Sequence, residues 1–186
     1  MPNSNYFLQY FTHLHDRLKT VNPEDLRKAA GLVMHAHQHQ CKIICVGNGG
    51  SAAMASHVSV DFTKVAGVRA INFNEADLIT CFANDYGYEK VFEKAIEFYG
   101  DSGDLLILIS SSGSSENVLN AARLANELDI SVITFTGFKN DNPLRKLGDI
   151  NFWVDCKSYN IVEMTHHIWL LSIVDYIVGK IEYPAS

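Results

Sequence analysis

The sequence predicts an α/β fold, with a doubly wound, mainly parallel sheet flanked by helices, in one domain over residues 1–186. Two observations support this prediction. Short apolar runs alternate along the chain with amphipathic segments, which is the pattern of parallel strands joined by crossover helices. The 186 residues are 47% hydrophobic, which is enough for one buried core, and no low-complexity linker divides them.

Two helices are expected before the first strand. In the first, apolar side chains recur at helical spacing, at Phe7, Phe11, Leu14 and Leu18. The second begins at Asn22, because Pro23 suits the first turn of a helix. Its apolar residues are Leu26, Ala29, Ala30, Val33 and Met34.

Four short apolar runs are interpreted as strands of the sheet. They cover residues 41–47, 105–110, 131–136 and 150–154. The first of them, CKIICVG, is typical of a parallel strand that is buried on both faces. The amphipathic segments that separate the strands are residues 51–64, 88–99 and 115–128.

The last predicted helix, over residues 161–181, is apolar in most directions and is therefore expected to be buried nearly all round. A single small domain has difficulty covering its terminal helix completely. Together with the two N-terminal helices, this predicts packing between subunits of a homo-oligomer. Burial of the helix within one subunit is the alternative.

Composition excludes several classes of function. The net charge is −6 and no block of Lys or Arg is present, so we expect no direct binding of nucleic acid. No apolar stretch reaches about 18 residues, so we expect no membrane span. The N-terminal residues lack the pattern of a signal peptide, and the four cysteines lack CxxC spacing. We therefore expect reduced cysteines in a cytoplasmic protein.

Two loops rich in Gly and Ser follow predicted strands and precede predicted helices, at residues 47–51 and 110–115. Ligands of open parallel sheets bind beyond the carboxyl ends of the strands. Glycines allow close approach of the backbone, and a helix N-terminus offers free N–H groups to an anion. The loops predict a site for a phosphate monoester, although similar sequences also form plain turns and helix caps. Neither GxGxxG nor GxxxxGK[ST] occurs, so we expect a sugar phosphate and no nucleotide cofactor.

The segments GNGGSAAMASH (47–57), ISSSGSSENV (109–118) and ANDYGYEKVF (83–92) resemble those of the SIS (sugar isomerase) fold, in its phosphoheptose isomerase branch. The resemblance implies a homotetramer with active sites at subunit interfaces. It implies that the phosphate of the substrate is held beside Gly49 and Gly50 by serines, namely Ser51, Ser110, Ser111, Ser112 and Ser115. It also implies that Asn48 and Asp85 lie near the sugar.

The resemblance to isomerases of this branch implies a shared set of catalytic residues. A His and a Glu lie one helical turn apart after the glycine loop, and here His57 matches the His while Asp61 replaces the Glu. The carboxylate of Asp61 is one methylene shorter and retreats by roughly 1 to 1.5 Å. A displacement of that size can cost about a hundredfold in rate.

The last helix of the family carries a Gln or Glu, a His three residues later and a second His eight residues later. Glu163 and His166 match the first two positions, but Leu171 stands at the third. His167 is a substitute only if the register of the helix shifts by a turn. Several relatives bind zinc, and here His57, Asp61, Glu163 and His166 are the corresponding ligands. Two interpretations stay open: a rearranged acid–base or zinc site, which includes His166 or His167, or ordinary polar residues.

Two functions follow as hypotheses. The first is an isomerase that converts sedoheptulose 7-phosphate, or a related ketose phosphate, to a heptose 7-phosphate for lipopolysaccharide, capsule or other glycoconjugate precursors. The alternative is an inactive sugar-phosphate-binding protein, because one tetrameric relative of this branch binds the bacterial replication initiator. A ligand-sensing regulator is a third possibility, which the lack of a helix-turn-helix segment disfavours.

Overall fold

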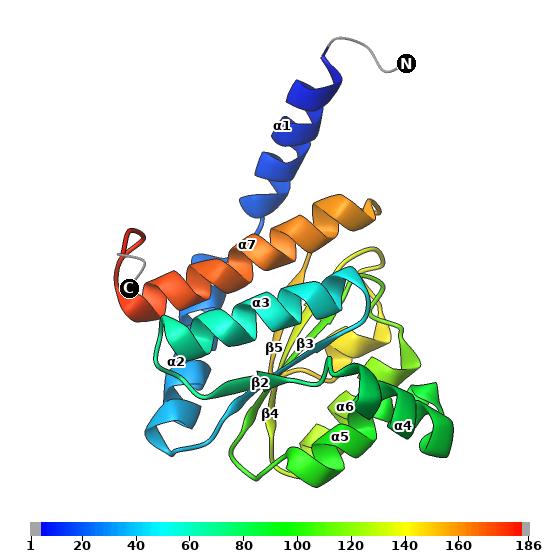
Figure 1. The fold of residues 1–186 in the computed structure, drawn as a ribbon. Coiled ribbons are helices and arrows are strands. Elements are labelled where there is room, and N and C mark those ends of the chain that lie inside the picture. The colour runs from blue at the N-terminus through cyan, green and yellow to red at the C-terminus, as the bar shows by residue number, and fades with distance from the viewer. Residues whose placement is uncertain (1–4, 184–186) are drawn as a thin grey trace.

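Five parallel strands form the sheet at the centre of the molecule, in the order β2-β1-β3-β4-β5 (Figure 1). The structure is a computed structural model that describes residues 5–183. The strands are β1 (Ile43–Gly47), β2 (Ala70–Asn72), β3 (Leu105–Ser110), β4 (Ser131–Thr136) and β5 (Ile150–Trp153). The chain moves outward from β1 to the edge strand β2 and then returns to β3 on the other side of β1. The direction of winding therefore reverses between β1 and β3.

Helices cover both faces of this sheet (Figure 1). The elements of helical structure are α1 (Tyr6–Leu18), α2 (Pro23–Gln38), α3 (Gly50–Lys64), α4 (Ala76–Tyr86), η1 (Tyr88–Lys90), α5 (Val91–Tyr99), α6 (Glu116–Glu127), η2 (Pro143–Lys146) and α7 (Tyr159–Val178). One core cluster joins the sheet to α2, α3 and α7, and a second joins it to α5 and α6. Residues of β1 alternate between the two clusters, with Ile43 and Cys45 in the first and Ile44 and Val46 in the second.

The predicted fold class is confirmed, and two elements that the sequence analysis missed are added to it. These are β2 and α4, which together form the connection between α3 and η1. Strand β2 has only three residues, all of them half-buried, so it lacks the long apolar run by which the other strands were found. The prediction of one domain over residues 1–186 includes residues 1–4 and 184–186, which lie outside the described residues, and it stays a prediction.

Helix α7 packs against α1, α2 and α3. It ends where Gly179 adopts a left-handed conformation, with φ of 81°, slightly before the predicted end at residue 181. Its length and composition would also suit a membrane span, contrary to the expectation from the sequence, but core helices of soluble proteins meet the same criteria. Burial is incomplete, because Met164, Ile168 and Tyr176 are exposed.

Helix α1 projects from the body of the molecule (Figure 1). One side of it, with Tyr10, Leu14 and Leu18, packs against the core cluster under α7. On the other side Phe7 is 70% exposed and Phe11 is 60% exposed. Within residues 5–183, this apolar face of α1 is left without a partner.

His166 is a core residue in the middle of α7. Its side chain is fully buried, and its Nε2 donates a hydrogen bond to the carbonyl oxygen of Thr136, at 2.9 Å. Its Nδ1 has no partner, so protonation there would place an unpaired charge in the core. Desolvation lowers the pKa of His166 to about 4.

This burial predicts a specific acid sensitivity. The unfolded chain binds a proton on His166 below about pH 6.5, whereas the folded chain resists protonation down to about pH 4. The free energy of unfolding should therefore fall as the pH drops through this window, by up to about 3 kcal/mol from this group. Urea unfolding between pH 4 and 7 measures the fall.

The variant His166→Gln, which has no titrating group, should show a shallower dependence of stability on pH. The exposed His37 on α2 provides the matched control. His37→Gln should leave the slope unchanged. An equal slope in the His166→Gln protein would contradict the prediction.

Candidate functional site

The two loops singled out in the sequence lie at the point where the winding of the sheet reverses. They follow β1 and β3, which are adjacent parallel strands with Gly47 paired to Ile109. In open α/β sheets a crevice forms at such a reversal, outside the carboxyl ends of the two strands. The fold therefore places both loops at one site.

A small pocket of about 150 Å³ occupies this position. It is lined by residues of both loops and of the first turns of α7, namely Asn48, Ser51, Ile109, Ser110, Ser111, Ser112, Ser115, Tyr159 and Glu163. The structure thus brings together Asn48, the five serines and Glu163, which the sequence analysis had selected from three separate segments. Tyr159 is an additional lining residue that the analysis missed, because it lies in none of the family segments.

Glycines in the first loop allow close packing at the start of α3. Gly49 is the N-cap of α3 and has φ of +55°, which disfavours other residues. Gly50 faces Glu163: a Cβ atom on Gly50 would lie only 2.5 Å from the Glu163 Oε2. The carboxylate therefore lies directly against the first turn of α3, and a side chain at position 50 would displace it.

The serines of the second loop divide into two roles. The hydroxyls of Ser110 and Ser112 accept hydrogen bonds from the backbone N–H groups of Gly113 and Ser114, and so shape the loop. The hydroxyl of Ser111 is buried without a hydrogen-bond partner. Ser115 is the N-cap of α6, yet its side chain makes no capping hydrogen bond. The hydroxyls of Ser111 and Ser115 are therefore available to a ligand.

Electrostatics favour an anion that is held by neutral donors. Among the described residues that line the pocket there is no lysine or arginine. The N-termini of α3 and α6, with their partial positive charge and free N–H groups, both lie at the pocket. Glu163 is the acidic member of the lining, and desolvation raises the pKa of its carboxyl group.

A chain of three titratable side chains lies further along α3 and α7. The His57 Nε2 is 3.3 Å from the Asp61 Oδ2, and the His57 Nδ1 is 2.9 Å from the His167 Nε2. A carboxylate only accepts hydrogen bonds, so the His57 Nε2 carries the proton that faces Asp61. In neutral His57 the Nδ1 is then an acceptor, and the His167 Nε2 donates to it.

This order of protons leaves the Nδ1 of neutral His167 with a free lone pair. Desolvation lowers the pKa of His167, and neighbouring His57 lowers it further, while Asp61 opposes the shift. His167 is therefore held largely unprotonated near neutral pH and is suited to accept a proton. It reaches His57 from its observed place on α7, one turn after Glu163.

The structure does not bring all of the expected catalytic and zinc-binding residues together. His57 and Asp61 are adjacent, whereas His166 points to the sheet and contacts Thr136. Leu171, at the position of the second family histidine, packs against the core. Within residues 5–183 no group of three or more His, Cys, Asp or Glu side chains is arranged to hold a metal ion.

Asp85 is also separate from the pocket. It lies near the end of α4, is exposed, and accepts a hydrogen bond from the side chain of neighbouring Asn84, at 2.8 Å. It is not among the residues that line the pocket in this chain. Its expected place near the sugar stays a prediction.

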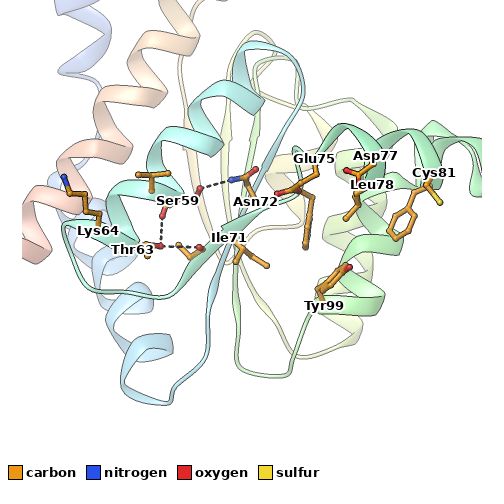
Figure 2. Close-up of a pocket in the computed structure, with 14 residues that line it drawn as sticks. Ser59, Thr63, Lys64, Ile71, Asn72, Glu75, Asp77, Leu78, Cys81 and Tyr99 are labelled. Carbon is orange, nitrogen blue, oxygen red and sulfur yellow. Dashed lines mark hydrogen bonds between the residues drawn. The ribbon is translucent and has the colours of Figure 1, made fainter.

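A larger hollow lies elsewhere, in a groove of about 960 Å³ beside the edge strand β2. Figure 2 shows its side chains, which come from α3, β2, α4 and the end of α5. Several polar groups in it are already paired, since Asn72 donates to the Ser59 hydroxyl and Thr63 donates to a backbone carbonyl. The groove contains no loop suited to an anion, so the smaller pocket is the candidate site.

Known proteins resemble this chain over most of its length. The SIS domain family matches residues 6–137. A phosphoheptose isomerase from Buchnera aphidicola subsp. Acyrthosiphon pisum (strain Tuc7) is 33% identical over 162 residues, which cover 84% of this chain and 83% of that protein.

Solved structures agree with this similarity. A phosphoheptose isomerase from Neisseria gonorrhoeae has a TM-score of 0.86 at 29% identity, covering 94% of this chain and 96% of that one. One from Francisella tularensis has a TM-score of 0.86 at 25% identity, covering 97% and 100%. With both anion-binding loops in place at the reversal of the sheet, the chain belongs to the SIS domain family, in its phosphoheptose isomerase branch.

Proposed function

We propose that this protein is an isomerase that converts sedoheptulose 7-phosphate to a heptose 7-phosphate, a precursor of lipopolysaccharide, capsule or other glycoconjugates. The observation that carries the proposal is the pocket of free serine hydroxyls and helix N-termini, with titratable side chains one and two turns away. The relatives named phosphoheptose isomerase support the same activity and the same substrate.

The dimensions of the site suit a seven-carbon sugar. Six carbon–carbon bonds span roughly 7.5 Å in an extended chain, by ordinary bond lengths. The seven residue steps from Gly50 to His57 rise by about 10 Å along α3. With the phosphate at the serine loop, carbons 1 and 2 therefore reach the level of His57 and His167.

The reaction moves one proton between those carbons. A base takes the proton from C1, the electron pair forms the C1=C2 bond of an enediol, and the C2 oxygen gains a proton. The proton then returns to C2 while the C1 hydroxyl loses its own and becomes the aldehyde. In the proposed mechanism the His167 Nδ1 accepts the carbon proton, and His57 with Asp61 stabilises the resulting imidazolium. Glu163 lies against Gly50 at the phosphate end of the site, so in this mechanism the C1 and C2 oxygens exchange their protons with solvent.

Proton NMR of sedoheptulose 7-phosphate in deuterated buffer tests the activity. We expect deuterium at the exchanging carbon and a new aldose signal with the unaltered protein. His57→Ala and His167→Ala should each lower the rate by about a hundredfold or more, because general acid–base groups contribute on that scale. His37→Ala, on the surface of α2, should leave the rate unchanged.

The absence of any exchange in the unaltered protein, on this or a shorter ketose phosphate, would reject the proposal. The alternative of an inactive binding protein, which Asp61 and Leu171 motivate, would then gain support if the sugar still binds. The similarity to phosphoheptose isomerases over more than four-fifths of the chain favours the enzyme.

A zinc site was one of the interpretations that the sequence left open, because several relatives bind zinc, but the donor set does not fit. Both ring nitrogens of His57 are engaged by neighbouring side chains, His166 faces the core, and residue 171 is Leu. A four-coordinate zinc site needs its donors on one centre. The proposed mechanism therefore has no step through a metal.

Removal of metals tests this part of the proposal. After exhaustive dialysis against EDTA, the rate of isomerisation should stay within about twofold of the untreated rate, since only side chains exchange protons in the mechanism. Mass spectrometry of the metal content provides the control for complete removal. A loss of activity that zinc alone restores would contradict the mechanism.

We further propose that the protein is a homotetramer, as the family resemblance implies. The exposed aromatic face of α1 supports an assembly, because isolated proteins rarely expose neighbouring large apolar side chains such as Phe7, Leu8 and Phe11. The exposed residues of α7 and the groove beside β2 provide further apolar surface.

Substitution of α1 tests the assembly. Phe7→Glu with Phe11→Glu should lower the mass measured by light scattering from that of a tetramer to that of a smaller species, because charges would be buried at the contact. Tyr176→Glu, at the exposed end of α7, shows whether that helix takes part. An unchanged mass in the α1 variant would place the contact elsewhere.

A cytoplasmic location completes the proposal. The four cysteines are free, as in proteins of reducing compartments, and the net charge of −6 does not favour nucleic acid as a partner. The expected small-molecule partner is the sugar phosphate alone, without a nucleotide cofactor.

A further inference from the structure

Three side chains from three distant segments meet beside the pocket through hydrogen bonds. The Asn48 Nδ2 donates to the Asn117 Oδ1, and the Asn117 Nδ2 donates back to the Asn48 Oδ1, both at 2.9 Å. The hydroxyl of Tyr88 donates to the same Asn48 Oδ1, also at 2.9 Å. Each of the three family-like segments of the sequence supplies one of these residues.

The partners of Asn48 come from firmly placed elements. Asn117 is in the first turn of α6 and is 3% exposed. Tyr88 begins η1, directly after Gly87, whose φ of 91° turns the chain out of α4. Asn48 itself lies in the loop between β1 and α3 and lines the pocket. The amide pair therefore connects the loop between β1 and α3 to the first turn of α6, beside the pocket, and Tyr88 contacts the pair from the side of η1.

The hydrogen-bond donors and acceptors of the Asn48 side chain show which of them is left for a ligand. A primary amide has one oxygen with two acceptor positions and one nitrogen with two N–H donors. Tyr88 and Asn117 occupy both acceptor positions, and Asn117 occupies one of the donors. One N–H of Asn48 is left for a ligand. The amide pair alone would survive a concerted flip of both amides, and the hydrogen bond that Tyr88 donates to the Asn48 Oδ1 selects this orientation.

We infer that Asn117 and Tyr88 are positioning residues, which fix Asn48 as a donor of one N–H to an acceptor oxygen of the bound sugar phosphate. The identity of the ligand rests on the proposed function; the orientation of the amide does not. Neither residue contacts the ligand in this arrangement, because their polar groups point to Asn48. Preorganised donors of this kind bind without reorganisation.

The orientation can be tested without any ligand. In nitrogen–proton NMR spectra, the side-chain amide of Asn48 is assigned by its loss in Asn48→Ala. Its protons should exchange with water about tenfold faster in Asn117→Ala, and measurably faster in Tyr88→Phe. Asn126→Ala is the matched control, because Asn126 lies on the same helix and donates only to the carbonyl of Leu147. Equal exchange rates in all of the variants would overturn the inference.

Binding of sedoheptulose 7-phosphate, measured by calorimetry, tests the consequence. Asn117→Ala should weaken it about tenfold and Tyr88→Phe about threefold, with the Asn126→Ala affinity and melting temperature unchanged. In an Asn48→Ala background, Asn117→Ala should cause no further loss, because it acts through Asn48. A full additional loss in that background would show a role independent of Asn48 and would overturn the inference.

The two tests separate the inference from the proposed function. If the unaltered protein neither binds nor converts sedoheptulose 7-phosphate, the proposed function fails and the amide exchange alone decides the positioning role. If the sugar binds normally to Asn117→Ala and Tyr88→Phe, the function stands and the inference fails.

Discussion

The parallel pairing of β1 with β3 is the constraint on which the site depends. Both strands are buried on both faces, and their register pairs Gly47 with Ile109. The two loops that follow must therefore start side by side, and the helices that they begin, α3 and α6, point their N-termini at the same pocket. Neither loop alone provides an anion site of this kind, because each contributes only part of the lining.

The packing of α3 beside α7 places titratable side chains next to the pocket. Contacts at two levels connect these helices, Gly50 with Glu163 and His57 with His167. Because Gly50 has no side chain, the two helices approach closely beside the pocket. The imidazoles of His57 and His167 meet farther along the helices. In the proposed function, a substrate held by its phosphate at the first of these contacts reaches the imidazoles at the second.

Two neighbouring histidines on α7 point in different directions and make different contacts. His166 and His167 are one residue apart, so their side chains point about 100° away from each other. His166 faces the sheet, is fully buried and donates to Thr136, whereas His167 faces α3 and reaches His57. The same amino acid therefore serves the core at one position and the site at the next. Leu171, two turns after Glu163, packs against the apolar core at the position where the family resemblance implies a histidine.

The sequence by itself determined the fold class, four of the five strands and both ligand loops, because long apolar runs and the Gly–Ser segments are local signals. It also proposed His57, Asp61 and Glu163 as site residues, and their roles stay predictions. It missed β2, which is too short to form a long apolar run, and α4, although Leu78, Ile79 and Phe82 recur there at helical spacing. Only the tertiary structure decided between His166 and His167, joined Asn48 to Asn117 and Tyr88, and separated Asp85 from the pocket of this chain. The physical reason is that these outcomes depend on the rotation of α7 and on contacts between residues far apart in the chain, which no local pattern encodes.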